Sequence, residues 1–204
     1  MKEKLIVFTR YPEAGKTKTR LIPVLGKEGA AKLHQQLTEG TISQAKQLKN
    51  TRQLFVEVNF TGGSEELMEA WLGNDIFYQN QVTGDLGIKM AAAFEMSFNS
   101  GVEKVVLIGT DCPGLNSQLI ALAFEELEGQ DLVLGPALDG GYYLIGLRRF
   151  VPEIFMGINW GTAEVLGQSV AIAQNLNLAI AYLSPLADID RPEDLSILPP
   201  SINL

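Results

Sequence analysis

The chain contains little cysteine, histidine or positive charge. Its 204 residues include one cysteine, Cys112, so no disulfide can form within the chain, which fits a reducing compartment such as the cytoplasm. The single histidine, His34, is expected on the surface of a helix and supports neither a catalytic triad nor a histidine metal site. The formal net charge of −8 disfavours a general nucleic-acid binder, which needs a basic surface.

Long hydrophobic runs are absent as well. No stretch reaches the roughly 20 apolar residues that a membrane-spanning helix requires, and the apolar run at residues 5–8 is too short for a signal peptide. No internal repeat, low-complexity segment or linker is apparent. We therefore expect a soluble cytoplasmic protein with one domain over residues 1–204 and no membrane span.

The apolar run at residues 105–108 predicts a strand buried on both faces, as in the middle of a parallel sheet. Apolar, alternating or β-prone segments predict further strands at 5–8, 53–60, 76–78, 131–134, 142–147 and 178–183. Helical patterns lie between them, at 26–48, 116–128 and 161–175 and from Ser64 and Asp85 onward, with Asp85, Asn116 and Thr162 as N-caps. The alternation favours an α/β fold.

The loop after the first strand is the most basic part of this acidic chain. Its position suits a phosphate-binding loop, and its cations are Arg10, Lys16, Lys18 and Arg20. It is not a P-loop, because Arg10 replaces the first glycine of that motif and Pro23 interrupts the helix that must follow. The alternative is a solvated charged loop.

Several carboxylates also follow predicted strands. Asp111 comes directly after the central strand, where α/β sheets bind ligands, although aspartate at such a place also serves in turns or caps. The turn at Asp139, Gly140 and Gly141 suggests backbone packed against a ligand, or alternatively a glycine hairpin.

Two further side chains are candidates. Lys89, near the start of a predicted helix, could reach a phosphate. Asp190 and Glu193 are spaced as a capping box, so that Asp190 is either a ligand or an N-cap.

Four segments in this order, residues 15–21, 109–113, 139–147 and 188–195, together resemble the DUF2064 family of proposed glycosyltransferases, some of them associated with arsenosugar biosynthesis. The resemblance extends from residue 4 to about 198. It implies the nucleotide-diphospho-sugar transferase superfamily and its GT-A type fold, a Rossmann-like three-layer sandwich with a mixed, mostly parallel central sheet.

The resemblance also implies roles. Asp111 matches the aspartate that binds the metal on the nucleotide diphosphate, and Asp190 matches a second ligand in nucleotidyltransferases. Lys18 and Arg20 match the phosphate-binding turn of the molybdenum-cofactor and phospholactate guanylyltransferases. The oxygen ligands suit Mg²⁺ or Mn²⁺.

The leading hypothesis is a metal-dependent glycosyltransferase with a nucleoside-diphosphate sugar donor and a small-molecule acceptor. Asp111 is the catalytic metal ligand, and Asp139 is the candidate base if the reaction inverts the sugar carbon. The donor contacts are Arg10, Lys16, Lys18, Arg20, Lys89, Gly140 and Gly141. The alternatives are a nucleotidyltransferase that takes a nucleoside triphosphate and releases pyrophosphate, and a nucleotide-binding module without turnover.

Overall fold

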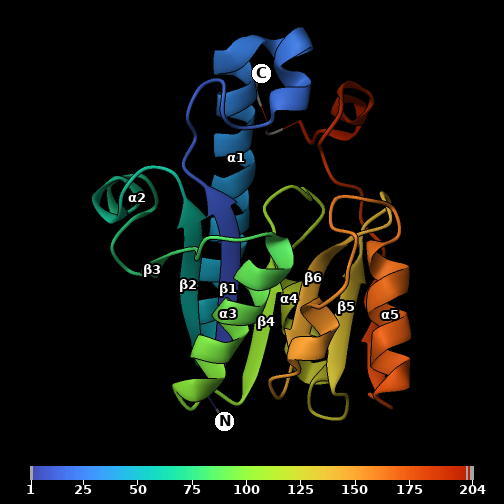
Figure 1. Ribbon diagram of the computed structural model, residues 1–204. Coiled ribbons are helices and arrows are strands. Elements are labelled where there is room, and N and C mark those ends of the chain that lie inside the picture. Colours follow the sequence, from blue (N-terminus) through green and yellow to red (C-terminus); the bar gives the residue numbers. More distant parts are fainter. Residues whose placement is uncertain (1, 201, 203–204) are drawn as a thin grey trace.

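The predicted strands form one sheet in the computed structural model, which describes residues 2–200 and 202 (Figure 1). The strands are β1 (Glu3–Arg10), β2 (Leu54–Thr61), β3 (Phe77–Asn80), β4 (Lys104–Ile108), β5 (Leu132–Pro136), β6 (Tyr142–Leu147) and β7 (Ile180–Tyr182). Their spatial order is β3-β2-β1-β4-β6-β5-β7. Only β6 runs antiparallel to its neighbours β4 and β5 within the described pairings, so the sheet is mixed and mostly parallel, as predicted.

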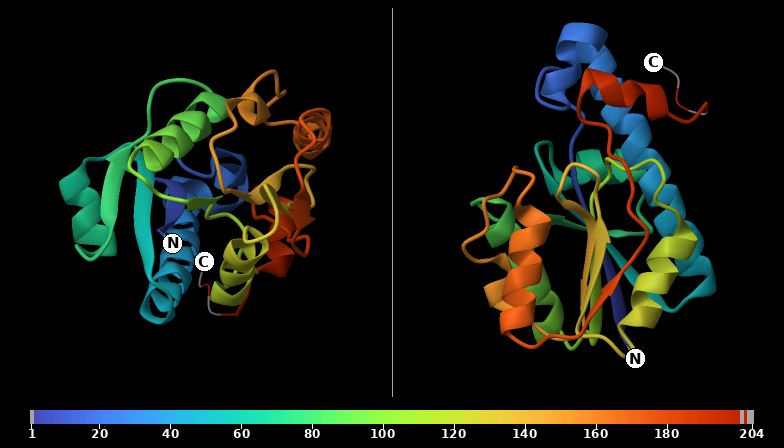
Figure 2. Two further views of the ribbon diagram at one scale, coloured as in Figure 1. Left: turned by 90° about the horizontal axis from the view of Figure 1, so that it is seen from below. Right: turned by 90° about the vertical axis from the view of Figure 1, so that its right-hand side faces the viewer.

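Helices cover both faces of the sheet, which gives the three layers seen in the right-hand view of Figure 2. The α-helices are α1 (Ile22–Thr51), α2 (Glu65–Leu72), α3 (Leu86–Asn99), α4 (Ser117–Glu126) and α5 (Val165–Asn175). Short 3-10 helices occupy Thr19–Leu21, Pro152–Phe155 and Pro192–Ile197. Helices α1, α2 and α4 pack on one face, and α3 and α5 pack on the other. Within the described residues, no helix has the length and apolar character needed to cross a membrane.

The central position of β4 in the sheet explains why its sequence is apolar without a break. Val106 and Ile108 belong to the core under α1 and α4, whereas Val105 and Leu107 belong to the core under α3 and α5. Because successive strand residues point to opposite faces, a strand covered on both sides must be apolar at every position. The prediction from residues 105–108 is confirmed.

A third, smaller core lies beyond the carboxyl edge of the sheet, at the top of Figure 1. It joins the beginning of α1 to the C-terminal segment and contains Leu21, Ala30, Leu33, Leu37 and Ile189. Helix α1 begins earlier than predicted, at Ile22, but Gly26 breaks it with φ 71°. This small core holds the basic loop and the residues around Ile189 against each other.

Two of the three predicted N-caps are confirmed. The Asp85 carboxylate accepts a hydrogen bond from Ile88 N at 2.9 Å, and Asn116 accepts one from Leu119 N at 3.0 Å. The prediction for Thr162 is wrong, because α5 begins only at Val165. The Thr162 hydroxyl instead donates to Asn159 O at 2.8 Å and closes the preceding turn.

Candidate active site

A cleft of about 550 Å³ opens at the carboxyl ends of β1 and β4. It brings together most of the predicted site residues, although they come from segments far apart in the chain: Arg10, Lys16, Lys18, Arg20, Lys89, Asp111 and Asp190 all line it. This is the edge at which open α/β sheets bind ligands. The cleft contains five cationic side chains and two carboxylates, so it is locally basic in an acidic protein.

Lys18 is the most constrained residue of the basic loop. Its backbone is left-handed, with φ 46°, and its side chain is only 4% exposed. The Nζ atom pairs with Asp111 Oδ1 at 2.7 Å and donates to the Ile189 carbonyl. A left-handed non-glycine residue is held there by its surroundings and marks a site worth a functional explanation.

Asp111 links the central strand to the C-terminal segment. Its carbonyl accepts a hydrogen bond from Ile189 N at 2.9 Å, and its side chain remains 48% exposed beside Lys18. The carboxylate is therefore positioned through its own backbone and still open to the cleft. Its proximity to the basic loop, which the sequence predicted, is present in the structure.

The other cations of the cleft differ in their surroundings. Arg10 Nη1 donates to Lys16 O at 3.3 Å, and the Lys16 ammonium group pairs with Glu13. No ion pair joins the half-buried Lys89 to any residue that the structure describes. Lys89 is thus the cation of this cleft most readily available to a ligand.

Asp190 does not cap the last 3-10 helix, so that alternative is wrong. Arg191 occupies the N-cap position, and the Asp194 carboxylate accepts from the backbone N–H groups of Arg191 and Asp190 at 2.7 and 3.0 Å. The Asp190 carboxylate pairs instead with Arg20 across the cleft. The capping box therefore lies one residue later than predicted, because the carboxylate that accepts from the N-cap backbone belongs to Asp194 and not to Glu193.

A second hollow, of about 270 Å³, adjoins the basic cleft and shares Leu86, Gly109 and Asp111 with it. Asp139 and Asp188 also line this hollow. Burial raises the pKa of Asp188 above its usual value, and the nearby carboxylates of Asp139 and Asp111 raise it further. Asp111, Asp139 and Asp188 thus concentrate negative charge in this hollow.

Asp188 was missed as a site residue by sequence reasoning. The available signal was alternation within the extended segment before the last 3-10 helix. Ile189 points into the small core, so Asp188 and Asp190 point elsewhere, and they line the second hollow and the basic cleft respectively.

The two neighbouring glycines have different surroundings. A Cβ atom on Gly140, where φ is 91°, would lie 2.3 Å from Ala163 O, so this glycine is required by packing against the chain itself. Gly141 lines the second hollow and donates its N–H to Asp139 Oδ1 at 2.8 Å. Ligand contact at Gly140 and Gly141 stays a prediction, and Gly140 has a sufficient structural reason without it.

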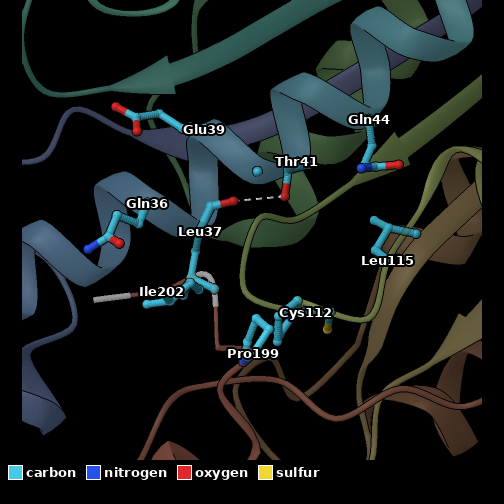
Figure 3. A pocket seen from close by; sticks show the side chains of 11 residues that line it. Gln36, Leu37, Glu39, Thr41, Gln44, Cys112, Leu115, Pro199 and Ile202 are labelled. Carbon is cyan, nitrogen blue, oxygen red and sulfur yellow. Dashed lines mark hydrogen bonds between the residues drawn. The ribbon is translucent and has the colours of Figure 1, made fainter. Parts of the chain in front are cut away.

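Another pocket, of about 440 Å³, lies between α1 and the loop after β4 (Figure 3). Within it Thr41 Oγ1 donates to the Leu37 carbonyl at 3.1 Å, and Cys112, Pro199 and Ile202 close the opposite side. It contains none of the predicted site residues. Burial and neighbouring carboxylates raise the pKa of the Cys112 thiol, which keeps it protonated and unreactive.

His34 is buried, and the prediction of a surface position is wrong. The residue is 6% exposed and lies against the end of β1, where Nε2 is 2.9 Å from Arg10 O and 3.4 Å from Thr9 Oγ1. His34 lies on the face of α1 that packs against the end of β1, where the Arg10 carbonyl and the Thr9 hydroxyl are within reach of its ring. Burial lowers the pKa of His34 below its usual value.

This burial predicts a pH-dependent stability. The unfolded chain protonates His34 near pH 6.5 but the folded chain only at lower pH, so its contribution is complete above about 6.5 and is lost as pH falls. We expect the wild type to lose about 1 kcal/mol more than His34→Gln between pH 7.5 and 5.5, measured by urea unfolding. Equal losses in the two proteins would contradict the assignment, because the chain has no other histidine.

The family model described as "Uncharacterized protein conserved in bacteria (DUF2064)" matches residues 42–162. A solved structure from Desulfovibrio desulfuricans G20, provisionally assigned as a nucleotide-diphospho-sugar transferase, shares 34% identity and a TM-score of 0.87. The alignment covers 94% of this chain and 84% of that one. The chain belongs to the DUF2064 family. The family predicted from the four sequence segments is confirmed.

More distant structures show how widely the fold is used. Glucosyl-3-phosphoglycerate synthase from Mycobacterium tuberculosis, solved with Mn²⁺, UDP and phosphoglyceric acid, has 13% identity and a TM-score of 0.59 over 96% of this chain and 73% of that one. 4-Diphosphocytidyl-2C-methyl-D-erythritol synthase from Anaerococcus prevotii has 9% identity and a TM-score of 0.63 over 96% and 95% of the two chains. No curated protein matches the sequence. The DUF2064 fold is thus that of glycosyl- and nucleotidyltransferases.

Proposed function

We propose that this DUF2064 protein is a metal-dependent glycosyltransferase that uses a nucleoside-diphosphate sugar and a small-molecule acceptor. One observation carries the proposal: Asp111 and the basic loop after β1 share one cleft at the carboxyl edge of the sheet. The chain is also similar, at 34% identity, to a structure provisionally assigned as a nucleotide-diphospho-sugar transferase, and this similarity supports the same class of substrate.

The basic cleft provides the charge that a diphosphate needs. Lys89 is free of ion pairs within the described structure, and Arg10, Lys16 and Arg20 line the same space. Charge-assisted hydrogen bonds from these side chains to phosphate oxygens are strong and directional. Lys18 is already engaged with Asp111 and Ile189, so its contribution is to position the carboxylate as well as to attract phosphate.

The carboxylates suit a divalent metal that arrives with the diphosphate. Within the described residues, no group of three or more histidine, cysteine, aspartate and glutamate side chains is arranged to hold a metal alone. The donor set consists of hard carboxylate oxygens that repel one another, which fits Mg²⁺ or Mn²⁺ completed by phosphate oxygens.

We propose that Asp111 holds the metal together with Asp190, or with Asp188 in its place, since Asp190 pairs with Arg20. The bound metal would stabilise negative charge on the departing diphosphate.

Asp139 is the proposed base. It lies in the second hollow, next to the donor cleft, and its Oδ1 is fixed by the Gly141 N–H at 2.8 Å. Oδ2 is then the oxygen that accepts the proton of an acceptor hydroxyl as that hydroxyl attacks the sugar carbon.

Nucleotidyl transfer is the second candidate. It is favoured by the fold shared with a CMP:2-keto-3-deoxy-manno-octonic acid synthetase solved in complex with CTP, at 10% identity and a TM-score of 0.57. In that reaction the same cleft would take a nucleoside triphosphate and release pyrophosphate. A non-catalytic nucleotide-binding module is the third candidate.

The deciding experiment combines binding with product analysis. We expect Mn²⁺ together with one nucleoside-diphosphate sugar to raise the melting temperature, and EDTA to abolish the shift. Turnover with an acceptor should then release the nucleoside diphosphate and a glycosylated product. Pyrophosphate release from a triphosphate without sugar transfer would establish the second candidate instead, and metal-dependent binding without any product would establish the third.

A further inference from the structure

The balance of charge differs between the two halves of the site. In the basic cleft five cations, Arg10, Lys16, Lys18, Arg20 and Lys89, outnumber the carboxylates of Asp111 and Asp190. The adjoining hollow is lined by Asp111, Asp139 and Asp188 and, within the part of the chain that the structure describes, by no lysine or arginine. A ligand that spans both halves therefore meets positive charge at one end and negative charge at the other.

The second half is also aromatic. Tyr142, Tyr143 and Trp160 line the hollow beside its three carboxylates. The rings of Tyr142 and Trp160 pack edge to face at a centroid distance of 6.4 Å, which fixes the wall. An apolar wall with a few polar groups is the usual composition of a pocket for a small organic molecule.

Gly87 allows the Trp160 side chain to lie close to α3. A Cβ atom at Gly87 would lie 2.5 Å from Trp160 Nε1 and 2.6 Å from Phe155 O, so no side chain can come between the helix and the indole. The tryptophan is held at the boundary between α3 and the hollow. Trp160 is therefore part of the wall of this pocket.

The acidic character continues outward. A further hollow of about 500 Å³, the outer hollow, shares Asp139, Asp188, Gly161 and Thr162 with the second hollow. It adds three acids and two arginines: Asp190, Glu193, Asp194, Arg20 and Arg191. Together with Asp139 and Asp188 this hollow has five acids against two arginines, so the approach to the second hollow is negative.

We propose that the second substrate of this site is an alcohol that carries no negative charge, such as a sugar or polyol. This inference rests on the proposed function and specifies its acceptor. Ionised carboxylates only accept hydrogen bonds, so they pair with hydroxyl groups and repel phosphate and carboxylate groups. A divalent cation on Asp111 does not reverse this, because it arrives with a donor diphosphate of opposite charge.

The transfer balances with such an acceptor. The acceptor hydroxyl oxygen forms a bond to C1 of the donor sugar, and the bond between C1 and the diphosphate oxygen breaks. The diphosphate leaves with that electron pair, while the hydroxyl proton passes to Asp139. No oxidant or other co-reactant is needed.

The first test compares matched acceptors. Glycerol and glycerol 3-phosphate, and glucose and glucose 6-phosphate, are offered with the donor that stabilises the protein in Mn²⁺. Glycosylated product is expected with the free alcohol of a pair, at a rate at least tenfold above that with its phosphate ester. Preference for the phosphate ester would overturn the proposal while leaving glycosyl transfer intact.

A variant makes the comparison sharper. Leu138 is 71% exposed, follows β5 directly before Asp139, and lines the outer hollow. Leu138→Arg should increase kcat/KM for the phosphate ester at least tenfold relative to the matched control Leu138→Gln, with kcat/KM for the free alcohol unchanged within twofold. An identical ratio of ester to alcohol in both variants would contradict the charge argument.

A second test needs no acceptor and is independent of turnover. In Trp71→Phe, whose remaining tryptophan is Trp160, fluorescence is quenched with caesium and with iodide. After normalisation to a free tryptophan derivative, caesium should quench at least twofold better than iodide, and Asp188→Asn should reduce the preference. Equal or better quenching by iodide would overturn the proposal, whereas failure of the proposed function would show as loss of metal-dependent donor binding.

Discussion

Asp111→Asn is expected to lower kcat about 10²–10³-fold and to remove the dependence of the remaining turnover on Mn²⁺. Asparagine has nearly the same shape, but its neutral amide neither holds a divalent metal well nor balances Lys18, whose Nζ lies 2.7 Å from Asp111 Oδ1. The measurement is product formation against metal concentration, together with donor binding in the presence and absence of EDTA.

Asp75→Asn is the matched control for this experiment. Asp75 also pairs with a lysine at 2.7 Å, Lys46, but it lies outside the clefts that contain Asp111. Its replacement should leave kcat and metal dependence unchanged within twofold. Full, chelator-sensitive activity of Asp111→Asn would show that the metal, if needed, binds elsewhere.

Gly140→Ala is expected to have the largest effect on stability, about 2–4 kcal/mol lost from the free energy of unfolding. Two costs add at this position. Alanine resists the backbone φ of 91°, and its Cβ would lie 2.3 Å from Ala163 O, a backbone atom that cannot simply rotate away. Urea unfolding of both proteins at pH 7.5 measures the difference.

Gly101→Ala separates the two costs. Gly101 has a similar φ of 81°, but a Cβ there would meet nothing within 4 Å, so this variant should lose only about 1 kcal/mol. If Gly140→Ala costs no more than Gly101→Ala, the packing role of Gly140 is wrong, and contact with a ligand becomes the better explanation for this glycine.

The layers of the fold were predictable because they follow from local patterns. The unbroken apolar run in β4 and the caps at Asp85 and Asn116 are each visible within a few residues of sequence. The antiparallel placement of β6 between β4 and β5 was not predictable in the same way. It depends on which strands pair over long distances, and a single sequence carries no direct signal for that choice.

The site was predictable to the extent that it follows strand ends. Asp111 and the cations after β1 share a cleft because both follow parallel strands at one edge of the sheet. The burial of His34 and of Lys18 was missed, since each depends on a partner from elsewhere, the end of β1 for His34 and residues 111 and 189 for Lys18. The shift of the N-cap from Asp190 to Arg191 depends on which carboxylate accepts from the N-cap backbone N–H, and the backbone geometry decides this in favour of Asp194.

The contacts of Ile189 have a consequence for how the protein is made. Its N–H and carbonyl groups hold Asp111 and Lys18, so the segment around residue 189 completes a cleft whose other lining residues lie between Phe8 and Asp111. These groups are added to the growing chain after all the other residues that line the cleft, apart from Asp190, have been synthesised. If the cleft binds a nucleotide as proposed, a chain that stops before position 189 should not bind it, because Asp111 and Lys18 then lose the backbone groups that hold them.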